Sequence, residues 1–436
     1  MAGRCSPDPG VSTKAWRASL LHFDADDRIE RIDDGLLVVE DGRMAAVGEH
    51  ARLAALHPGV EVVDWRGLTL APGFIDMHLH AAQVDVIGAS APGLLQWLER
   101  RTFVQEARFA DPAHCREASD AFIDELLRNG VTSAMVFCSV HPQSVDALFA
   151  SAQARRMRLA AGKVLMDRNI PDALCEPLAD AIAHSAALIQ RWHGVDRLGY
   201  ALAPRFAPSC SDALLRAVAE LRAAHPGVWV QTHAAESREE CAWVAELFPS
   251  ARSYVDVYER CGLLGPRSVL AHCIQIDDAD RARLAASGTS VAVCPGSNLF
   301  LGSGLFDFDA ARCAGLAWGL GSDVGAGPSF SPFRTMLSAH EVARLSGCAL
   351  EPAELWYRQT LGAARALDLH AHIGNLAPGL EADFIAIDAA ATPLLARRSR
   401  AAESLDDWLF ALIALADDRA VRHTVVLGRD ESPGTR

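Results

Sequence analysis

The feature that most limits how this chain can fold is an eightfold alternation of short apolar runs with longer amphipathic segments. The runs have the length of buried β-strands, and the segments between them carry apolar residues three and four positions apart. Strands that alternate with helices predict parallel βαβ units, and eight such units close a (β/α)8 barrel. The runs cover residues 73–80, 131–137, 159–166, 198–206, 228–233, 268–272, 290–294 and 317–323, and helical stretches include 112–129, 212–225 and 334–345.

Both ends of the chain have a different character from the middle. Short β segments are expected at residues 16–23, 35–40 and 44–47, with a turn at Asp41–Gly42, and again at 383–388 and 424–428. We therefore expect an α/β protein in which both termini build one small β-sandwich domain beside a TIM-like, metal-dependent hydrolase barrel. The expected parts are residues 1–70, 71–372 for the barrel, and 373–436, with a disordered tail over 429–436.

Composition and charge argue against several kinds of binding partner and several cellular locations. The formal net charge of −14, without any basic run, disfavours binding to a nucleic-acid backbone. The sequence shows no signal peptide and no run of about eighteen apolar residues, so neither secretion nor a membrane span is expected. Eleven cysteines without a C-x-x-C pair are typical of buried thiols in a reducing compartment. The expected location is the cytoplasm.

His78 and His80 lie where the first barrel strand ends, in FIDMHLH. Residues two apart on a strand share a face, so both imidazoles can point into the barrel mouth and bind one metal ion. Catalytic groups of parallel barrels come from these carboxyl ends. Taken alone, the pair is also compatible with a chance H-x-H among sixteen histidines.

His233 closes the fifth strand in VQTHAAE, and Glu236 follows where the chain leaves that strand. A third imidazole would complete the three protein ligands of a hydrolytic zinc site. A carboxyl group beside it can carry protons. The alternative for Glu236 is a helix-start residue, because acidic groups favour helix N-termini.

His272 closes the sixth strand and Asp323 the eighth. Each has a structural alternative: a hydrogen-bonded core histidine, and a helix-capping aspartate. However, four strand ends that each carry a metal- or proton-handling residue are poorly explained by independent chance. Together they predict a metal site in the barrel mouth.

The number of metal ions follows from the scarcity of lysine. Some barrel hydrolases hold two metals bridged by a modified lysine at the end of the fourth strand. Lysine occurs only at Lys14 and Lys163, and the fourth strand, LGYALAPRF, has none. We expect one metal ion per subunit; zinc suits imidazole and carboxylate ligands, and Fe(II) is the alternative.

These motifs resemble the amidohydrolase superfamily, whose single-metal deaminases share PGFID-x-H-x-H, the H-x-x-E after strand five, the strand-six histidine and the strand-eight aspartate. Within it, the chain is similar to the guanine deaminases from about residue 30 to 428, through LLQWLERRTFVQEARF, GKVLMDRN, APRFAPSCS and CPGSNLFLGSG. The glutamine after H-x-H and the PRF on strand four are specific to that group. CPGSN and GSDVGAG depart from its usual motifs, which concerns rate or loop conformation and not reaction type.

The resemblance implies a role for each candidate residue. The zinc ligands would be His78, His80, His233 and Asp323. The catalytic residues would be Glu236, which protonates a ring nitrogen, Asp323, which takes a proton from water, and His272, which orients the oxygen. Gln83, Arg205 and Phe206 would hold the substrate, with His141 either a further pocket residue or a structural loop histidine.

The implied reaction is hydrolysis of guanine to xanthine and ammonia in purine catabolism, by a homodimer. One alternative is an amidohydrolase that acts on another purine, a pterin or a triazine. Another is an inactive barrel kept as a scaffold, which usually lacks metal ligands. A cytidine-deaminase-type fold is excluded, because it needs H-x-E with P-C-x-x-C and neither occurs.

Overall fold

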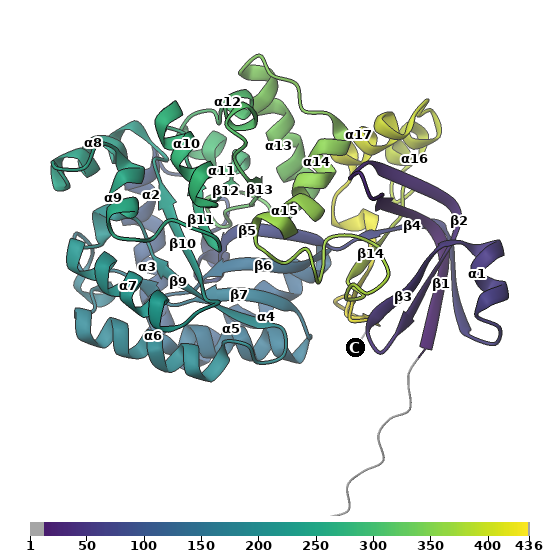
Figure 1. The fold of residues 1–436 in the computed structure, drawn as a ribbon, viewed down its shortest axis with the longest axis horizontal. Coiled ribbons are helices and arrows are strands. Elements are labelled where there is room, and N and C mark those ends of the chain that lie inside the picture. The colour runs from purple at the N-terminus through teal and green to yellow at the C-terminus, as the bar shows by residue number, and fades with distance from the viewer. Residues whose placement is uncertain (1–12, 435–436) are drawn as a thin grey trace, which may run out of the picture.

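The computed structural model describes residues 13–434 and has two parts, a barrel wrapped by helices and a sheet beside it (Figure 1). Eight parallel strands form the barrel in the hydrogen-bonded order β13-β12-β11-β10-β9-β7-β6-β5, and a short strand, β8, pairs with β9. The barrel predicted from the sequence is therefore confirmed. Its strands are β5 (Phe74–His80), β6 (Val131–Phe137), β7 (Arg158–Gly162), β8 (Val164–Leu165), β9 (Leu198–Pro204), β10 (Trp229–Ala234), β11 (Ser268–His272), β12 (Ser290–Val293) and β13 (Trp318–Leu320).

Two predicted strands are shorter than the apolar runs that suggested them. The third run divides into β7 and β8 on either side of Lys163, and the eighth ends as a strand at Leu320. A close approach of backbones accounts for the first difference, because a Cβ at Gly162 would lie 1.7 Å from the carbonyl oxygen of Ala201. The apolar runs therefore predict which residues are buried, but not where the hydrogen-bonded strands end.

The barrel closes between β13 and β5 without a regular strand ladder. Directly after β13, the Asp323 amide donates to the His78 carbonyl and the His80 amide donates to the Val324 carbonyl, both at 2.8 Å. The Ser322 amide also donates to Asp76 Oδ1, 246 positions away, at 3.0 Å. We call these contacts the closing seam. The seam lies at the carboxyl ends of the first and last strands.

The side chains of β5 do not alternate strictly between the barrel interior and the outer layer. Ile75 and Met77 belong to the barrel-interior cluster, whereas Phe74 and Leu79 pack in the outer layer against the helices. Strict alternation would place residues 75 and 79 on the same face. The register with β6 shifts between Asp76 and Leu79, which accounts for the change.

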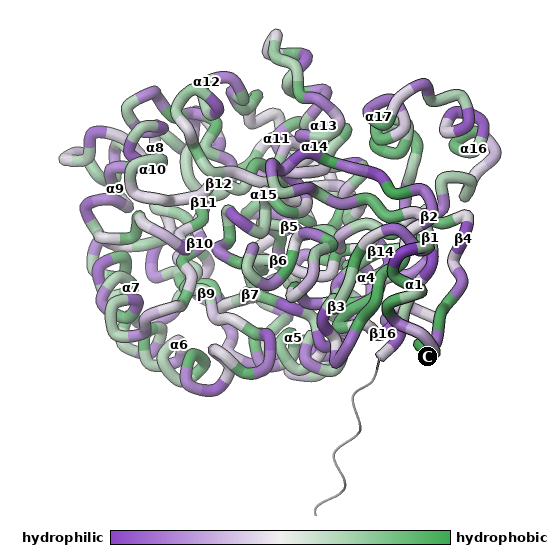
Figure 2. Tube along the Cα trace, turned by 45° about the vertical axis from the view of Figure 1, so that its right-hand side comes forward, coloured by the Kyte–Doolittle hydropathy of each residue, from purple (hydrophilic) through white to green (hydrophobic). Residues whose placement is uncertain are grey.

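Helices cover the outside of the barrel and carry the start signals that their sequences predict. Asp111 and Ser211 cap α4 and α7 with their side chains, and Pro112 occupies the first position of α4. Polar and apolar residues alternate along α6 and α7 in Figure 2, as expected for helices with one buried face. The helices are α4 (Pro112–Arg128), α5 (Pro142–Ala154), α6 (Leu178–Trp192), α7 (Asp212–Ala224), α8 (Arg238–Leu247), α9 (Tyr254–Arg260), α10 (Asp278–Ser287), α11 (Pro295–Leu301), α12 (Phe308–Cys313), α13 (Pro332–Leu345), α14 (Pro352–Gln359) and α15 (Leu361–Ala366), and the insertion after β5 holds α2 (Leu94–Trp97) and α3 (Phe103–Ala107).

The two termini build the small β domain together, as expected. Its seven strands are hydrogen bonded as one continuous sheet in the order β16-β15-β14-β4-β1-β2-β3. The Trp16 ring packs edge-on against Phe384 at 5.2 Å, which joins the two ends of the chain in one core. The strands are β1 (Thr13–Phe23), β2 (Ile29–Glu40), β3 (Arg43–Glu49), β4 (Glu61–Pro72), β14 (Phe384–Ile387), β15 (Val421–Val426) and β16 (Arg429–Asp430), with helices α1 (His50–Leu56), α16 (Pro393–Arg400) and α17 (Leu405–Leu415).

The expectation of a disordered tail from residue 429 is wrong at its beginning. Arg429 and Asp430 form β16 and pair with β15, and the Asp430 carboxylate accepts from His423 Nδ1 at 2.6 Å. A polar two-residue strand leaves no hydrophobic pattern from which to predict it. Residues 435 and 436 lie outside the described residues.

A buried group of charges joins the terminal sheet to the amino ends of the barrel strands. We call Arg158, Arg197, Glu381 and Asp383 the basal ion cluster. Arg158 opens β7 and donates from Nε to Glu381 Oε2 at 3.0 Å. Arg197 precedes β9; its Nη2 lies 2.8 Å from Glu381 Oε2, and its Nη1 donates to Asp383 Oδ1 at 3.1 Å. Each charge therefore has an opposite partner out of water.

Within residues 13–434, no helix combines the length and the apolar character needed to cross a membrane.

Candidate active site

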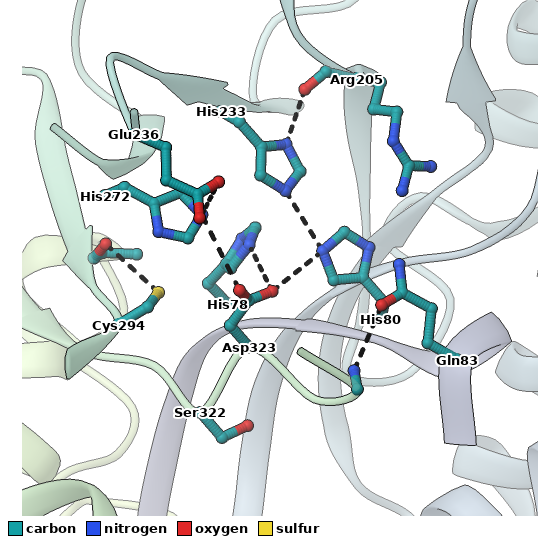
Figure 3. Close-up of polar contacts among 12 residues, drawn as sticks. His78, His80, Gln83, Arg205, His233, Glu236, His272, Cys294, Ser322 and Asp323 are labelled. Carbon is teal, nitrogen blue, oxygen red and sulfur yellow. Dashed lines mark hydrogen bonds and ion pairs between the residues drawn. The ribbon is translucent and has the colours of Figure 1, made fainter. Parts of the chain in front are cut away.

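The predicted histidines and aspartate lie together at the carboxyl end of the barrel (Figure 3). His78 and His80 end β5, His233 lies near the end of β10, and His272 ends β11. Asp323 follows β13 by three residues and is held by the closing seam. Four strands thus bring these side chains to one point.

Asp323 is at the centre of this cluster. Its Oδ1 lies 3.3 Å from His78 Nε2 and 3.2 Å from His80 Nε2, and its Oδ2 lies 3.9 Å from His272 Nε2. His233 Nε2 is 3.2 Å from His80 Nε2. Ligand atoms of His78, His233, His272 and Asp323 all lie within 4.8 Å of one another. This group holds three of the four predicted ligands together with His272, and His80 contacts it through Asp323 and His233.

Outer contacts fix which nitrogen of two histidines faces the cluster. His233 Nδ1 donates to the Arg205 carbonyl at 2.6 Å, and His272 Nδ1 donates to Asn298 Oδ1 at 2.9 Å. Each contact leaves Nε2 as the lone-pair side, which is how histidine ligands of metals are usually oriented. His78 Nε2 and His272 Nε2 are buried without a hydrogen-bond partner within the part of the chain that the structure describes. Unpartnered imidazole nitrogens beside a carboxylate fit a divalent transition metal.

Burial favours the neutral form of three imidazoles of the cluster. Burial lowers the pKa of His78 and His233, and it lowers the pKa of His80 to about 3. Burial alone would raise the pKa of Asp323, but the nearby side chains of His78 and His80 outweigh it and hold that pKa well below its usual range. Neutral imidazoles with an ionised carboxylate are the protonation states that metal binding requires.

Glu236 lies beside the cluster and outside the helix that follows it. Ser237 caps α8 and forms a capping box with Glu240, so the acidic residues of the first turn are Glu239 and Glu240. Glu236 Oε1 accepts from Ser303 Oγ at 2.9 Å, and Oε2 lies 3.4 Å from His272 Nε2. Burial and the charge of Asp323 raise the pKa of Glu236 to about 8. A carboxyl group that is protonated at neutral pH can act as a proton donor.

The backbone around the cluster is strained. His272 and Asp323 have φ values of 70° and 52°, in the left-handed region that ordinary residues avoid. Such conformations cost about 1–3 kcal/mol each and concentrate at functional sites. Here they occur at two of the side chains that converge on one another.

A partly enclosed cavity opens beside the cluster. Glu236, Asp323, His80 and His233 line its inner end. The other walls combine polar and apolar residues, which are Gln83, Arg205, Phe206, Glu240, Leu94, Trp97, Leu98, Leu301 and Ala326. Three of the four predicted substrate residues therefore lie in the cavity wall.

Arg205 and Gln83 share a partner that the sequence did not single out. Arg205 Nη1 donates to both oxygens of Glu106, at 2.9 and 2.7 Å, and Gln83 Nε2 donates to Glu106 Oε1 at 3.1 Å. Glu106 lies on α3 and is fully buried. The local sequence did not mark it, because FVQEA also contains Gln105 and is flanked by arginines. Its full burial distinguishes it, because carboxylates are almost never fully buried unless paired.

His141 is the predicted substrate residue that the structure does not bring into the cavity wall. It is the residue before α5, and its carbonyl accepts from Ser144 Oγ at 2.6 Å. Burial and nearby Lys163 lower its pKa. Lys163 is itself buried and pairs with Glu176, away from the histidine cluster.

Comparison with known proteins places these residues in a family context. The profile of the amidohydrolase family matches residues 69–429. The chain is 43% identical to the guanine deaminase of Escherichia coli, over 91% of each chain. Among solved structures, E. coli guanine deaminase superposes with a TM-score of 0.93 at 42% identity, covering 96% of this chain and 99% of that one. Guanine deaminase from C. acetobutylicum with bound guanine superposes with a TM-score of 0.89 at 27% identity, over 96% and 99%.

Proposed function

The chain belongs to the amidohydrolase family, and on that premise we propose that it hydrolyses guanine to xanthine and ammonia. One observation carries the proposal: a single cavity holds a cluster of histidines and aspartate at one end and a paired arginine and glutamine at the other. The first end suits hydrolysis and the second suits recognition of a purine edge. Guanine deaminases of similar sequence and structure cover nearly the whole chain.

The family is metal-dependent, and the ligands proposed for the metal are His78, His80, His233 and Asp323, with zinc as the ion. A bound divalent ion would supply a Lewis acid that lowers the pKa of water towards about 7. His272, whose Nε2 also lies in the cluster, would orient the attacking oxygen.

The proton transfers fall to two carboxyl groups. As water adds to C2 of guanine, Asp323 accepts a proton from that water. Glu236, with its pKa raised to about 8, donates its proton to the ring nitrogen beside C2. The C2–N bond to the exocyclic amine then breaks. The amine takes up the proton held by Asp323, Glu236 recovers a proton from the new C2 hydroxyl, and ammonia leaves as xanthine forms.

Arg205, Gln83 and Phe206 hold the purine at the other end of the cavity. The Arg205 guanidinium has only donors, so it suits a carbonyl oxygen. The Phe206 ring forms an apolar wall next to it. Leu94, Trp97 and Leu98 complete the apolar lining and limit the water that reaches the ring.

Incubation of the zinc-loaded protein with guanine tests this function. Ultraviolet absorbance follows the conversion to xanthine, an ammonia assay measures the leaving group, and adenine, cytosine, 8-oxoguanine, a pterin and a triazine serve as comparison substrates. Rapid loss of guanine with equal ammonia release is the expected result. If guanine is inert while the metal content is complete, the proposed substrate is wrong and another amino-heterocycle takes its place.

Three finer features remain proposals: a homodimer and a role in purine catabolism, which follow from the family resemblance, and a cytoplasmic location, which follows from the composition of the chain. Sedimentation or light scattering of the purified protein measures the first. A subunit mass of 46.7 kDa predicts a dimer of about twice that value, and a monomeric mass at micromolar concentration contradicts it.

A further inference from the structure

Glu106 contacts both polar side chains at the purine end of the cavity. Its two oxygens accept from Arg205 Nη1 at 2.9 and 2.7 Å, and its Oε1 also accepts from Gln83 Nε2 at 3.1 Å. All three side chains are buried. Among residues 13–434, Glu106 is the only hydrogen-bond acceptor of the Arg205 guanidinium. A single carboxylate therefore fixes two side chains that follow different strands of the barrel, β5 and β9.

The second contact of Gln83 determines how its amide is turned. Gln83 Oε1 accepts from the Gly325 amide at 3.3 Å while its Nε2 remains on Glu106. A flipped amide would place N–H against N–H at one end and oxygen against carboxylate at the other. Glu106 therefore holds the NH₂ group of Gln83 on the Arg205 side, as the two side chains appear in Figure 3.

The groups that remain available at this end are mainly N–H donors. Arg205 uses only Nη1 on Glu106, so Nε and Nη2 keep their donors, and Gln83 Nε2 keeps a second N–H. Such a surface matches acceptors, such as the oxo group and N7 of a 6-oxopurine. A 6-aminopurine presents a donor there, and a purine without a 6-substituent presents a C–H.

The position of Glu106 is itself held from outside the cavity. Ser139 Oγ donates to its carbonyl at 3.0 Å, and Phe103 of the same helix lies 5.5 Å from the Arg205 guanidinium carbon. Neither contact reaches the histidine cluster. Loss of the carboxylate should therefore disturb recognition before it disturbs metal binding.

We propose that Glu106 is a positioning residue that sets the preference of this site for 6-oxopurines by holding Arg205 and Gln83 with their donors towards the ligand. The proposal rests on the proposed function for the identity of the reaction. It assigns Glu106 no contact with the purine and no proton transfer.

Glu106→Gln tests the proposal with little change in size. The new amide offers one acceptor oxygen instead of two, and its NH₂ group meets the donors of Arg205 or Gln83. The ratio of kcat/KM for guanine to that for 2-aminopurine, which lacks the 6-oxo group, should fall by about tenfold or more, because one oriented donor is lost. Glu106→Asp keeps both acceptor oxygens and should recover part of this ratio.

A binding measurement separates this proposal from the deaminase assignment. Hypoxanthine and unsubstituted purine differ at the 6-position, and neither carries the 2-amino group that would react. Calorimetry on the zinc-loaded proteins should show a preference for hypoxanthine in the wild type and a smaller preference in Glu106→Gln. Inertness of guanine with the wild type would contradict the reaction, whereas an unchanged hypoxanthine preference in the variant would overturn the role of Glu106.

Glu381→Gln is the matched control, because it removes a buried carboxylate from two arginines at the opposite end of the barrel. It should lower stability and leave both substrate ratios unchanged. If Glu106→Gln lowers the efficiency for guanine and 2-aminopurine by the same factor, as a merely structural residue would, the proposal is wrong.

Discussion

Two buried groups of ionisable residues lie at opposite ends of the same barrel, and they differ in whether their members have partners of opposite charge. In the basal ion cluster, Arg158 and Arg197 face Glu381 and Asp383, and each charge is paired. At the mouth, unpartnered imidazole nitrogens face a central aspartate, and Glu236 has a pKa raised to about 8. At the base, buried charges are neutralised by their partners and stabilise the fold. At the mouth, the buried polar groups lack such partners among the described residues and are available for chemistry.

Removal of the metal from the mouth should have the largest effect. Chelation is expected to reduce guanine deamination to background, and Zn²⁺ should restore it better than Mg²⁺, because imidazole ligands favour zinc. The thermal midpoint should fall as well, since an ion bound only by the native state stabilises it. If activity survives chelation while atomic absorption shows that the metal has been lost, the reaction does not depend on a metal ion at the barrel mouth.

Glu236→Gln should separate activity from stability. Loss of the proton donor is expected to lower kcat by about 10²–10⁴-fold. The thermal midpoint should stay unchanged or rise, because a glutamine does not have to take up a proton on folding as a glutamate with a raised pKa does, and zinc content should remain complete. Glu239→Gln, an exposed change three residues along, is the control and should have wild-type kcat. Near-normal turnover in Glu236→Gln would remove this residue from the mechanism.

Arg197→Met should have the reverse effect at the base. It leaves Asp383 and Glu381 buried without one of their cations, which is expected to cost about 3–5 kcal/mol of unfolding free energy. Urea unfolding measures that loss, and kcat/KM of the folded fraction should match the wild type. The control Arg216→Met breaks an exposed pair with Asp212 on α7 and should change the urea midpoint far less. A specific loss of activity in Arg197→Met would mean that the two ends are coupled.

The pH dependence of the basal cluster should give the smallest effect. Burial alone would raise the pKa of Glu381, but the hydrogen bond with Arg158 and the charge of Arg197 outweigh it and lower that pKa. A lowered pKa in the folded state adds stability that is complete above the ordinary value of about 4.3 and is lost as the pH falls through the folded value. The stability difference between wild type and Glu381→Gln should therefore shrink below pH 4.3 in urea titrations. A difference that grows with acid would contradict the sign.

Local patterns explain why the barrel and most of the mouth could be predicted from the sequence. Residues such as His80 and His272 end apolar runs, and a strand end in a parallel barrel has a known place in space. The register shift in β5 leaves no trace in composition, because Ile75, Met77 and Leu79 alternate as in any strand. The sequence predicted where the histidines lie but not how the strand turns them towards the mouth.

Contacts across long sequence separations explain what was missed. Glu106 meets Arg205, 99 positions away, and its helix shows only the ordinary alternation of a half-buried segment. Strand β4 (Glu61–Pro72) was not predicted, because the exposed first part of the strand includes charged residues and shows no apolar run. His141 follows a strand end, which made it a candidate, but the chain turns there into α5 and takes the side chain out of the cavity wall.

Because of the closing seam, the site cannot be complete until the residues that follow β13 have been synthesised. The histidines of β5, β10 and β11 leave the ribosome before Asp323, and the contact of Ser322 with Asp76 joins positions 246 apart. A nascent or truncated chain that ends before β13 therefore carries all four histidines without the carboxylate at their centre. Such long-range closure is also slow relative to local helix formation. An unfinished copy of this protein therefore lacks the complete cluster until the last strand of the barrel has been made.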